Sequence, residues 1–537
     1  MSGTIKRAPD DVVRFDEKRI DSIFSDLNQC QLPGVAIGIA VDGQAIYRKG
    51  FGLASMELPI VLSPAIRMRI ASTTKHFTCF AYMLLCEEGR AAIDDPIGKY
   101  IPELHPLARN VTIRQLMGNT SGLRDIYEIC DQFSGGLGRP IPTEDLLAMY
   151  CEITDINAPP GTTWIYNNGG WLLLTVVIER ITGQPFEQVM RERVFAPVGM
   201  NDTLVRRSDS DFLANSASQH AAHPTSGFER RYWGKDNLVG AAAIVSTVDD
   251  LLRWLAHMDK PRIGSGATWA AMKTPLRLAN GTSTGYGLGL MLGRYRGIDT
   301  LYHAGNALGG NAQMLKVPDA GLDVVVLSNR QDVSSIELVN RILDGVLPDA
   351  EPIKPRESRA ISTGVFRSES SDRVIQLLGK DGQQMVSIGG INVPFDLDEE
   401  NVLHPISVFS YLKQTVMLIG NPLQPSGVRF WDFGNVDEFK SEALTTIDQA
   451  QHIAGRYRSE AIGVDATITE GKGGPCLKTV GNLGSAAYQL DCLADGIWRT
   501  QPTRLEFLGG ILVFNEEGQG FSFSNYQTRP LRFKRYS

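Results

Sequence analysis

A change of sequence pattern near residue 350 limits what this 537-residue chain can fold into. Before it, apolar residues recur with both helical and strand periods. The segment 348–355 carries three prolines and alternating charge, and beyond it the helical period is lost. A chain of this length is too long for one hydrophobic core. We therefore predict a mixed α and β domain over residues 1–350, followed by β structure.

The β region contains a short internal repeat. Gly364-Val365-Phe366-Arg367-Ser368-Glu369 resembles Gly455-Arg456-Tyr457-Arg458-Ser459-Glu460, and each copy opens a segment of short alternating runs separated by turn residues. The spacing between the copies suits a small barrel. We predict one β-barrel over residues 359–445 and another over residues 452–537, with a chance match of the two hexapeptides as the alternative.

In the first domain, predicted strands lie before and after a long helical section. A hairpin is expected around Asp42-Gly43, a long helical section follows, and strands over 311–317 and 322–328 precede a closing helix over 335–343. This order predicts an α+β domain with one antiparallel sheet and helices packed on it.

Ser72 and Lys75 lie at the start of a helix whose helical run, Phe77 to Glu88, ends at Gly89. A lysine three residues after a serine lies on the same helix face, which places an amine near a hydroxyl and can make serine a nucleophile without histidine. Taken alone, the pattern fits a helix N-cap with a surface lysine better. A second copy, Ser410-Tyr411-Leu412-Lys413, lies in a strand-like stretch, and we interpret it as having no catalytic role.

Two further motifs follow in chain order, Tyr166-x-Asn168 and His303-Ala304-Gly305. With Ser72-x-x-Lys75, they resemble the motifs of the penicillin-recognising serine hydrolases. This family includes class C β-lactamases, D-alanyl-D-alanine carboxypeptidases, related esterases and D-aminopeptidases. The resemblance covers roughly residues 20 to 345 and implies a β-lactamase/transpeptidase-like catalytic domain.

The resemblance also implies roles for the residues of these motifs. Ser72 would be the nucleophile, Lys75 the general base and Tyr166 the acid and base that protonates the leaving amine. Asn168 and His303 would orient the substrate. The oxyanion hole would consist of the backbone N–H groups of Ser72 and of Asn306, just past Gly305.

His303 stands where penicillin targets and many β-lactamases carry the lysine of Lys-Thr-Gly, which helps to bind a substrate carboxylate. A histidine is mostly neutral at pH 7, so this anchor is weakened. The His-x-Gly motif and two barrels resemble the D-aminopeptidase branch. The stretch 498–505, with two arginines and no acidic residue, would suit a linear peptide with acidic groups, although on its own a solvated barrel rim explains the arginines better. The chain also resembles the branch of the superfamily that cleaves linearised microcystin, which has about this size and the same Ser, Lys and Tyr trio.

We therefore expect a serine peptidase or amidase acting on short linear peptides with D- or unusual residues. An esterase or β-lactamase on the same scaffold, and a non-catalytic penicillin-binding-like protein, are the alternatives.

The net charge of −7 argues against nucleic acid and membrane as partners. No cluster has metal-ligand spacing, so neither metal nor cofactor is expected. Seven cysteines without a Cys-x-x-Cys pair, and no apolar leader, predict a cytoplasmic protein. A homodimer is left open.

Overall fold

The computed structural model describes residues 13–135, 141–223, 225, 227–233, 238–348, 350–352, 363–380, 383–406, 413–445, 452–471, 473–502, 509–515 and 518–536. The chain forms two units. The first comprises Met1–Asp95, Trp171–Leu276 and Gly285–Lys354. The second comprises Pro96–Gly170, Arg277–Thr284 and Pro355–Ser537.

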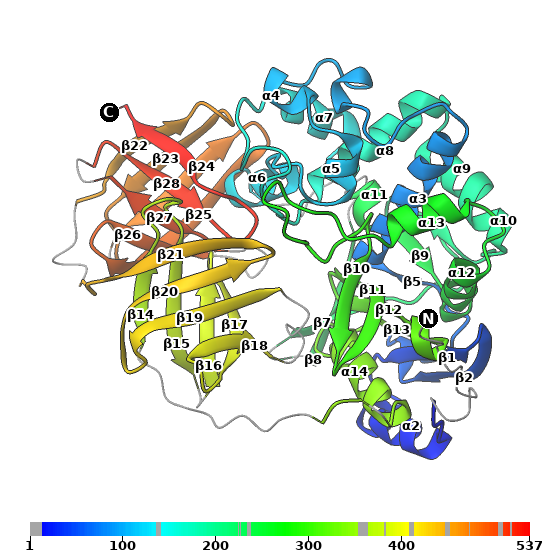
Figure 1. The fold of residues 1–537 in the computed structure, drawn as a ribbon. Helices are drawn as coiled ribbons and strands as arrows, with labels where there is room; N and C mark the ends of the chain where they lie inside the picture. Colours follow the sequence, from blue (N-terminus) through cyan, green and yellow to red (C-terminus); the bar gives the residue numbers. More distant parts are fainter. Residues whose placement is uncertain are drawn as a thin grey trace, which may run out of the picture. The chain divides into compact units, whose positions relative to one another are not determined.

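A six-stranded antiparallel sheet with the order β10-β11-β12-β13-β1-β2 forms the centre of the first unit (Figure 1). Its first hairpin turns at Asp42 and Gly43, whose φ angles of 49° and 77° fit a tight turn. This hairpin is where the sequence predicts it. The strands are β1 (Val35–Val41), β2 (Gln44–Phe51), β10 (Met291–Tyr295), β11 (Ile298–Ala307), β12 (Gly310–Val317) and β13 (Leu322–Ser328).

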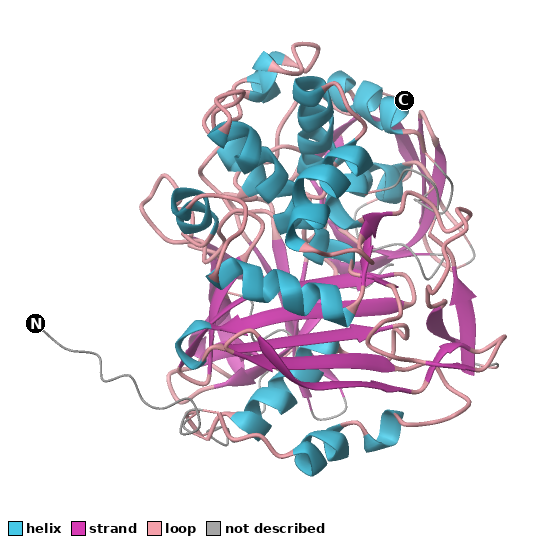
Figure 2. Ribbon diagram, turned by 90° about the vertical axis from the view of Figure 1, so that its right-hand side faces the viewer, coloured by secondary structure: helices cyan, strands magenta, loops and turns pink. Residues whose placement is uncertain are grey.

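Helices pack on both faces of this sheet. Successive residues of a strand point to opposite faces, so neighbouring strands can contact helices on either side. At Gly38 of β1 a Cβ atom would lie 2.4 Å from the side chain of Val248 in α12 (Val248–Asp259). On β2, the Tyr47 hydroxyl donates to Asp21 of α2 (Glu17–Ile23) at 2.6 Å. Figure 2 shows helices packed on the strands. The sheet is therefore buried between α12 and the layer that contains α2.

The other helices of the first unit surround these elements. They are η1 (Ser25–Leu27), η2 (Ala71–Thr73), α3 (Thr74–Glu87), α8 (Gly169–Thr182), α9 (Phe186–Met190), the π-helix η4 (Arg191–Phe195), α10 (Ala196–Val198), α11 (Val239–Ala242), α13 (Gly266–Met272), η5 (Pro318–Ala320) and α14 (Ser335–Val346). Three small sheets pair β3 (Leu53–Ser55) with β4 (Ile60–Val61), β9 (Ile244–Ser246) with β5 (Met68–Arg69) and β6 (Leu204–Val205), and β7 (Gln219–His223) with β8 (Gly227–Arg231).

The second unit combines a helical segment with two closed barrels of eight antiparallel strands each. The barrels are the yellow and the orange-to-red strands of Figure 1. The helices are η3 (Ile97–Lys99), α4 (Pro106–Arg109), α5 (Ile113–Met117), α6 (Ile126–Phe133) and α7 (Thr143–Glu152).

Each copy of the sequence repeat opens a barrel, as predicted. The first barrel contains β14 (Gly364–Arg367), β15 (Val374–Lys380), β16 (Gln383–Ile388), β17 (Ile391–Leu397), β18 (Val402–Pro405), β19 (Gln414–Asn421), β20 (Gln424–Asp432) and β21 (Asn435–Glu442). The second contains β22 (Gly455–Ser459), β23 (Val464–Thr469), β24 (Cys476–Gly481), β25 (Gly484–Ala494), β26 (Ile497–Pro502), β27 (Ile511–Phe514), β28 (Gly520–Ser524) and β29 (Leu531–Arg535).

The predicted fold class, an α+β domain followed by two antiparallel barrels, is confirmed. The exact domain boundaries stay a prediction. All seven cysteines are free thiols. Within the described part of the chain, no helix has the length and apolar character needed to cross a membrane.

Candidate active site

Ser72 lies in η2, a single 3-10 turn between β5 and α3. Ala71, which precedes it, is fully buried and has a φ of 46°, a conformation that costs free energy for a residue with a Cβ atom. Helix α3 begins at Thr74 and Gly89, with a φ of 69°, follows its C-cap, so the predicted helix end is confirmed. The strained turn presents Ser72 at the start of the helix.

The Lys75 amine is held beside the Ser72 hydroxyl. Its Nζ donates to Ser72 Oγ at 3.1 Å and to the Ala241 carbonyl at 3.2 Å, and the side chain is fully buried. The amine also lies 5.2 Å from the centre of the Trp171 ring, whose Nε1 donates to the Lys75 carbonyl at 3.2 Å. A neutral amine in this place could accept the Ser72 proton, which is the first step of acyl transfer.

Strand β11 passes close to the Ser72 turn because residue 305 is a glycine. A Cβ atom at Gly305 would lie 2.1 Å from the Ile70 carbonyl oxygen and 3.0 Å from the Ser72 nitrogen. Thr73 Oγ1 donates to the His303 carbonyl at 3.2 Å, which joins the turn to the same strand. Asn306 follows Gly305 and its side chain is exposed. The oxyanion hole of Ser72 and Asn306 amides stays a prediction.

The His303 ring is buried on β11 and is neutral. Its pKa is lowered to about 3, first because burial disfavours the cation and then because of the charge of Lys75. Nδ1 lies 2.6 Å from the Ala304 carbonyl and Nε2 lies 3.1 Å from the Tyr286 hydroxyl. The neutral tautomer that satisfies both contacts donates from Nδ1 and accepts at Nε2. Because the His303 ring is neutral, it offers no positive charge to bind a substrate carboxylate. The role of His303 in orienting substrate stays a prediction.

Tyr166 and Asn168 belong to the second unit. Asp125 accepts the amide of Asn168 at 2.5 Å and that of Gly169 at 3.1 Å, and it also caps α6. The Tyr166 carbonyl accepts from Gln527 at 3.0 Å. Both site residues are half-buried. Ser72 and Lys75 belong to the first unit, so the approach of Tyr166 to them stays a prediction.

Sequence reasoning missed several residues around these motifs. Trp171 carries no motif, and only its contact to Lys75 reveals it. The contact of Tyr286 with His303 is likewise visible only in the structure. The N-cap role of Asp125 could have been read from an acidic residue directly before a helical run. Arg499, expected at an open barrel mouth, donates to Asp491 at 2.9 Å, whereas Arg504 and Ser410 lie outside the described residues.

The described residues contain no group of three or more His, Cys, Asp or Glu side chains that could hold a metal ion. A lysine amine hydrogen-bonded to a serine hydroxyl at the start of a helix, beside an antiparallel sheet, defines a serine hydrolase of the Ser-x-x-Lys type. The family model described as Beta-lactamase matches residues 20–345. The chain belongs to the beta-lactamase family, as predicted.

Comparison with known proteins extends the likeness beyond residues 20–345. A D-aminopeptidase of Brucella melitensis is 24% identical over 477 residues, and one of Cereibacter sphaeroides is 26% identical over 480 residues. Each match covers 87% of this chain and 87% of the relative. The chain is thus a hydrolase related to D-aminopeptidases.

Solved structures share the fold. The octameric penicillin-binding protein homologue from Pyrococcus abyssi superposes with a TM-score of 0.56 at 21% identity, covering 79% of this chain and all of the other. The D-amino acid amidase from Ochrobactrum anthropi SV3 has a TM-score of 0.52 at 24% identity, covering 61% of this chain and 97% of the other.

Proposed function

We propose that the protein is a serine peptidase or amidase that hydrolyses short linear peptides containing D- or unusual residues. Linearised microcystin is one such peptide. The observation that carries the proposal is the 3.1 Å contact between the buried Lys75 amine and the Ser72 hydroxyl. The D-aminopeptidase relatives, whose matches cover 87% of this chain, support an amide substrate with a D-residue.

In the proposed reaction, neutral Lys75 takes the proton of Ser72 as Oγ attacks the carbonyl carbon of the scissile amide. The amides of Ser72 and Asn306 stabilise the negative oxygen of the tetrahedral intermediate. The C–N bond then breaks and Tyr166 gives a proton to the leaving amine. Water gives a proton to the Tyr166 phenolate as it attacks the carbonyl carbon of the resulting ester, the acyl–Oγ bond breaks, and Ser72 takes back its proton from Lys75.

The charge of the β11 side of the site supports the proposed substrate class. Neutral His303 offers no cation to a terminal carboxylate, the group that carboxypeptidase and β-lactamase substrates present. Peptides that are recognised by their amide groups and side chains suit such a site better. We therefore expect D-residue peptides, not β-lactams, as substrates.

The test combines labelling with turnover. Wild type, Ser72→Ala and Ser410→Ala are incubated with a fluorophosphonate probe and weighed intact by mass spectrometry. Ser410→Ala is the matched control because Ser410 heads the second Ser-x-x-Lys copy. We expect one adduct on wild type and on Ser410→Ala, and none on Ser72→Ala.

The same proteins are then given D-alanine p-nitroanilide, a nitrophenyl ester, nitrocefin and linear peptides with D-residues. Amide and peptide cleavage that requires Ser72 supports the proposal. Ester turnover without amide cleavage would overturn it in favour of an esterase, and nitrocefin turnover alone would favour a β-lactamase. Folded protein that neither labels nor cleaves would favour the non-catalytic alternative.

A further inference from the structure

The loop that joins β28 to β29 in the last barrel contacts the segment that carries Tyr166. Gln527 Nε2 donates to the Tyr166 carbonyl at 3.0 Å. In the same loop, the Gln527 carbonyl accepts from Asn157 Nδ2 at 3.2 Å, and the Arg529 amide donates to Asn157 Oδ1 at 3.0 Å. The loop and the helical segment of the second unit are therefore joined by both side-chain and main-chain hydrogen bonds.

Arg124 binds the end of this loop that leads into β29. Its guanidinium donates to the carbonyls of Arg529 at 2.7 Å and Pro530 at 3.2 Å, and it forms a two-point ion pair with Asp155 at 2.9 and 2.5 Å. Only 3% of Arg124 is exposed. A buried guanidinium is costly unless its donors are satisfied. The carbonyls of Arg529 and Pro530 accept two of the hydrogen bonds that the buried guanidinium must make. The loop is therefore held in this position by the fold.

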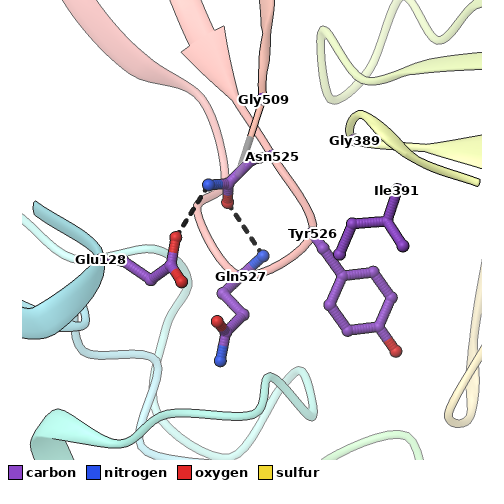
Figure 3. Close-up of a pocket in the computed structure, with 7 residues that line it drawn as sticks. All are labelled: Glu128, Gly389, Ile391, Gly509, Asn525, Tyr526 and Gln527. Atoms are coloured by element: carbon purple, nitrogen blue, oxygen red, sulfur yellow. Dashed lines mark hydrogen bonds between the residues drawn. The ribbon is translucent and has the colours of Figure 1, made fainter. Parts of the chain in front are cut away.

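Asn525 orients Gln527 from within the loop. Its Oδ1 accepts the amide of Gln527 at 3.0 Å, and its Nδ2 donates to the buried Glu128 at 2.9 Å (Figure 3). Oδ1 also accepts the amide of Thr528 at 2.6 Å. The first barrel supports the loop as well, because Arg529 Nη2 lies 3.0 Å from Asp432. Gln527 thus extends from a turn that is bonded to both α6 and the first barrel.

The Tyr166 segment is held on its other side by residues 119–125. Asn119 Oδ1 accepts the Asn167 amide at 3.2 Å, and Asp125 accepts the amides of Asn168 and Gly169. These bonds fix the N–H groups, and Gln527 fixes the Tyr166 carbonyl. A tyrosine hydroxyl is distant from its backbone, so a small rotation of the peptide moves it appreciably. A misplacement of about 1 Å can cost about 100-fold in rate.

We propose that Gln527 is a positioning residue for Tyr166, and that the last barrel thereby tunes the proton transfer assigned to that tyrosine. This inference rests on the proposed function. Gln527 acts through the Tyr166 main chain and need not touch substrate. The competing interpretation is a purely structural tie, whose removal would lower stability and leave the chemistry of each folded molecule unchanged.

The kinetic test compares Gln527→Ala with Gln489→Ala in the full-length protein. Gln489 lies in the same barrel and donates its side chain to the carbonyls of Gly473 and Pro475, so its removal costs a bond of the same type. We expect Gln527→Ala to lose roughly 10- to 100-fold in kcat on D-alanine p-nitroanilide. The loss on a nitrophenyl ester should be smaller, because nitrophenolate leaves without a proton. Gln527→Lys, which restores a donor, should recover part of the loss.

A second readout needs no turnover. 3-Fluorotyrosine is placed at position 166 and its ¹⁹F resonance is recorded in each background, with thermal unfolding to establish that the protein is folded. A shifted or broadened signal in Gln527→Ala, and an unchanged one in Gln489→Ala, supports positioning. Identical signals, or equal losses on anilide and ester, overturn it. If wild type cleaves no amide, the proposed function fails, and the ¹⁹F comparison still decides whether Gln527 positions Tyr166.

Discussion

Glu128 on α6 accepts a hydrogen bond of 2.9 Å from Asn525, which lies 397 residues further along the chain. The carboxyl is buried, and its pKa is raised to about 8 from 4.5, first by burial and then by the negative charge of Asp125. A carboxyl that stays protonated at neutral pH thus lies at the contact between the helical segment and the last barrel.

This contact predicts a stability that depends on pH. Between pH 4.5 and about 8, Glu128 holds its proton only in the folded chain, so the free energy of unfolding should fall as pH rises through that range, by at most about 1.4 kcal/mol per pH unit. Glu128→Gln, which stays neutral, should equal wild type near pH 5 and exceed it at pH 8 and above. Urea unfolding from pH 5 to 9 measures the difference.

Glu144→Gln is the control for Glu128→Gln, because it removes a carboxyl at an exposed position of α7. A gap between Glu128→Gln and wild type that does not change with pH would contradict the raised pKa of Glu128.

His303 predicts the opposite dependence. Its pKa of about 3 lies below the value of 6.5 for an exposed histidine, so below pH 6.5 the unfolded chain gains a proton that the folded chain excludes. Its stabilising contribution should be lost as pH falls from 6.5 towards 3. His303→Gln should lessen this loss, whereas His452→Gln, at an exposed side chain, serves as the control. The free energy of unfolding is measured from pH 7 to 4 for wild type and both variants. Equal declines in wild type and His303→Gln would refute the prediction.

Gly305 predicts a steric effect on catalysis. In Gly305→Ala, the new methyl group would lie 2.1 Å from the Ile70 carbonyl oxygen, so β11 must move away from the Ser72 turn. We expect kcat on D-alanine p-nitroanilide to fall about 100-fold and stability to fall by about 1–3 kcal/mol. Gly379→Ala on β15, where a Cβ atom meets nothing within 4 Å, is the control. Wild-type turnover by Gly305→Ala would rule out a close approach of β11.

Local features of this fold and site could be predicted from the sequence, and distant ones could not. Asp42-Gly43 determines a hairpin, and a lysine three residues after Ser72 must lie near it once a helix begins there. The neutrality of His303 follows from its residue type, but its cause, burial near Lys75, depends on tertiary structure. The contact of Gln527 with Tyr166 joins residues 361 apart in a loop without a motif, so no local pattern reveals it.

The contact between Lys75 and Ser72 leads to a prediction about the rate at which Ser72 reacts. Its amine touches the Ser72 hydroxyl at 3.1 Å, and a positioned general base contributes roughly 10²- to 10⁴-fold to such a step. Lys75→Ala should therefore slow fluorophosphonate labelling of Ser72 by about that factor, and amide turnover should fall with it. Lys413→Ala, which removes the lysine of the second Ser-x-x-Lys copy, should label at the wild-type rate. Time-resolved intact mass spectrometry gives both rates. Equal labelling of Lys75→Ala and wild type would show that Ser72 is activated by another group.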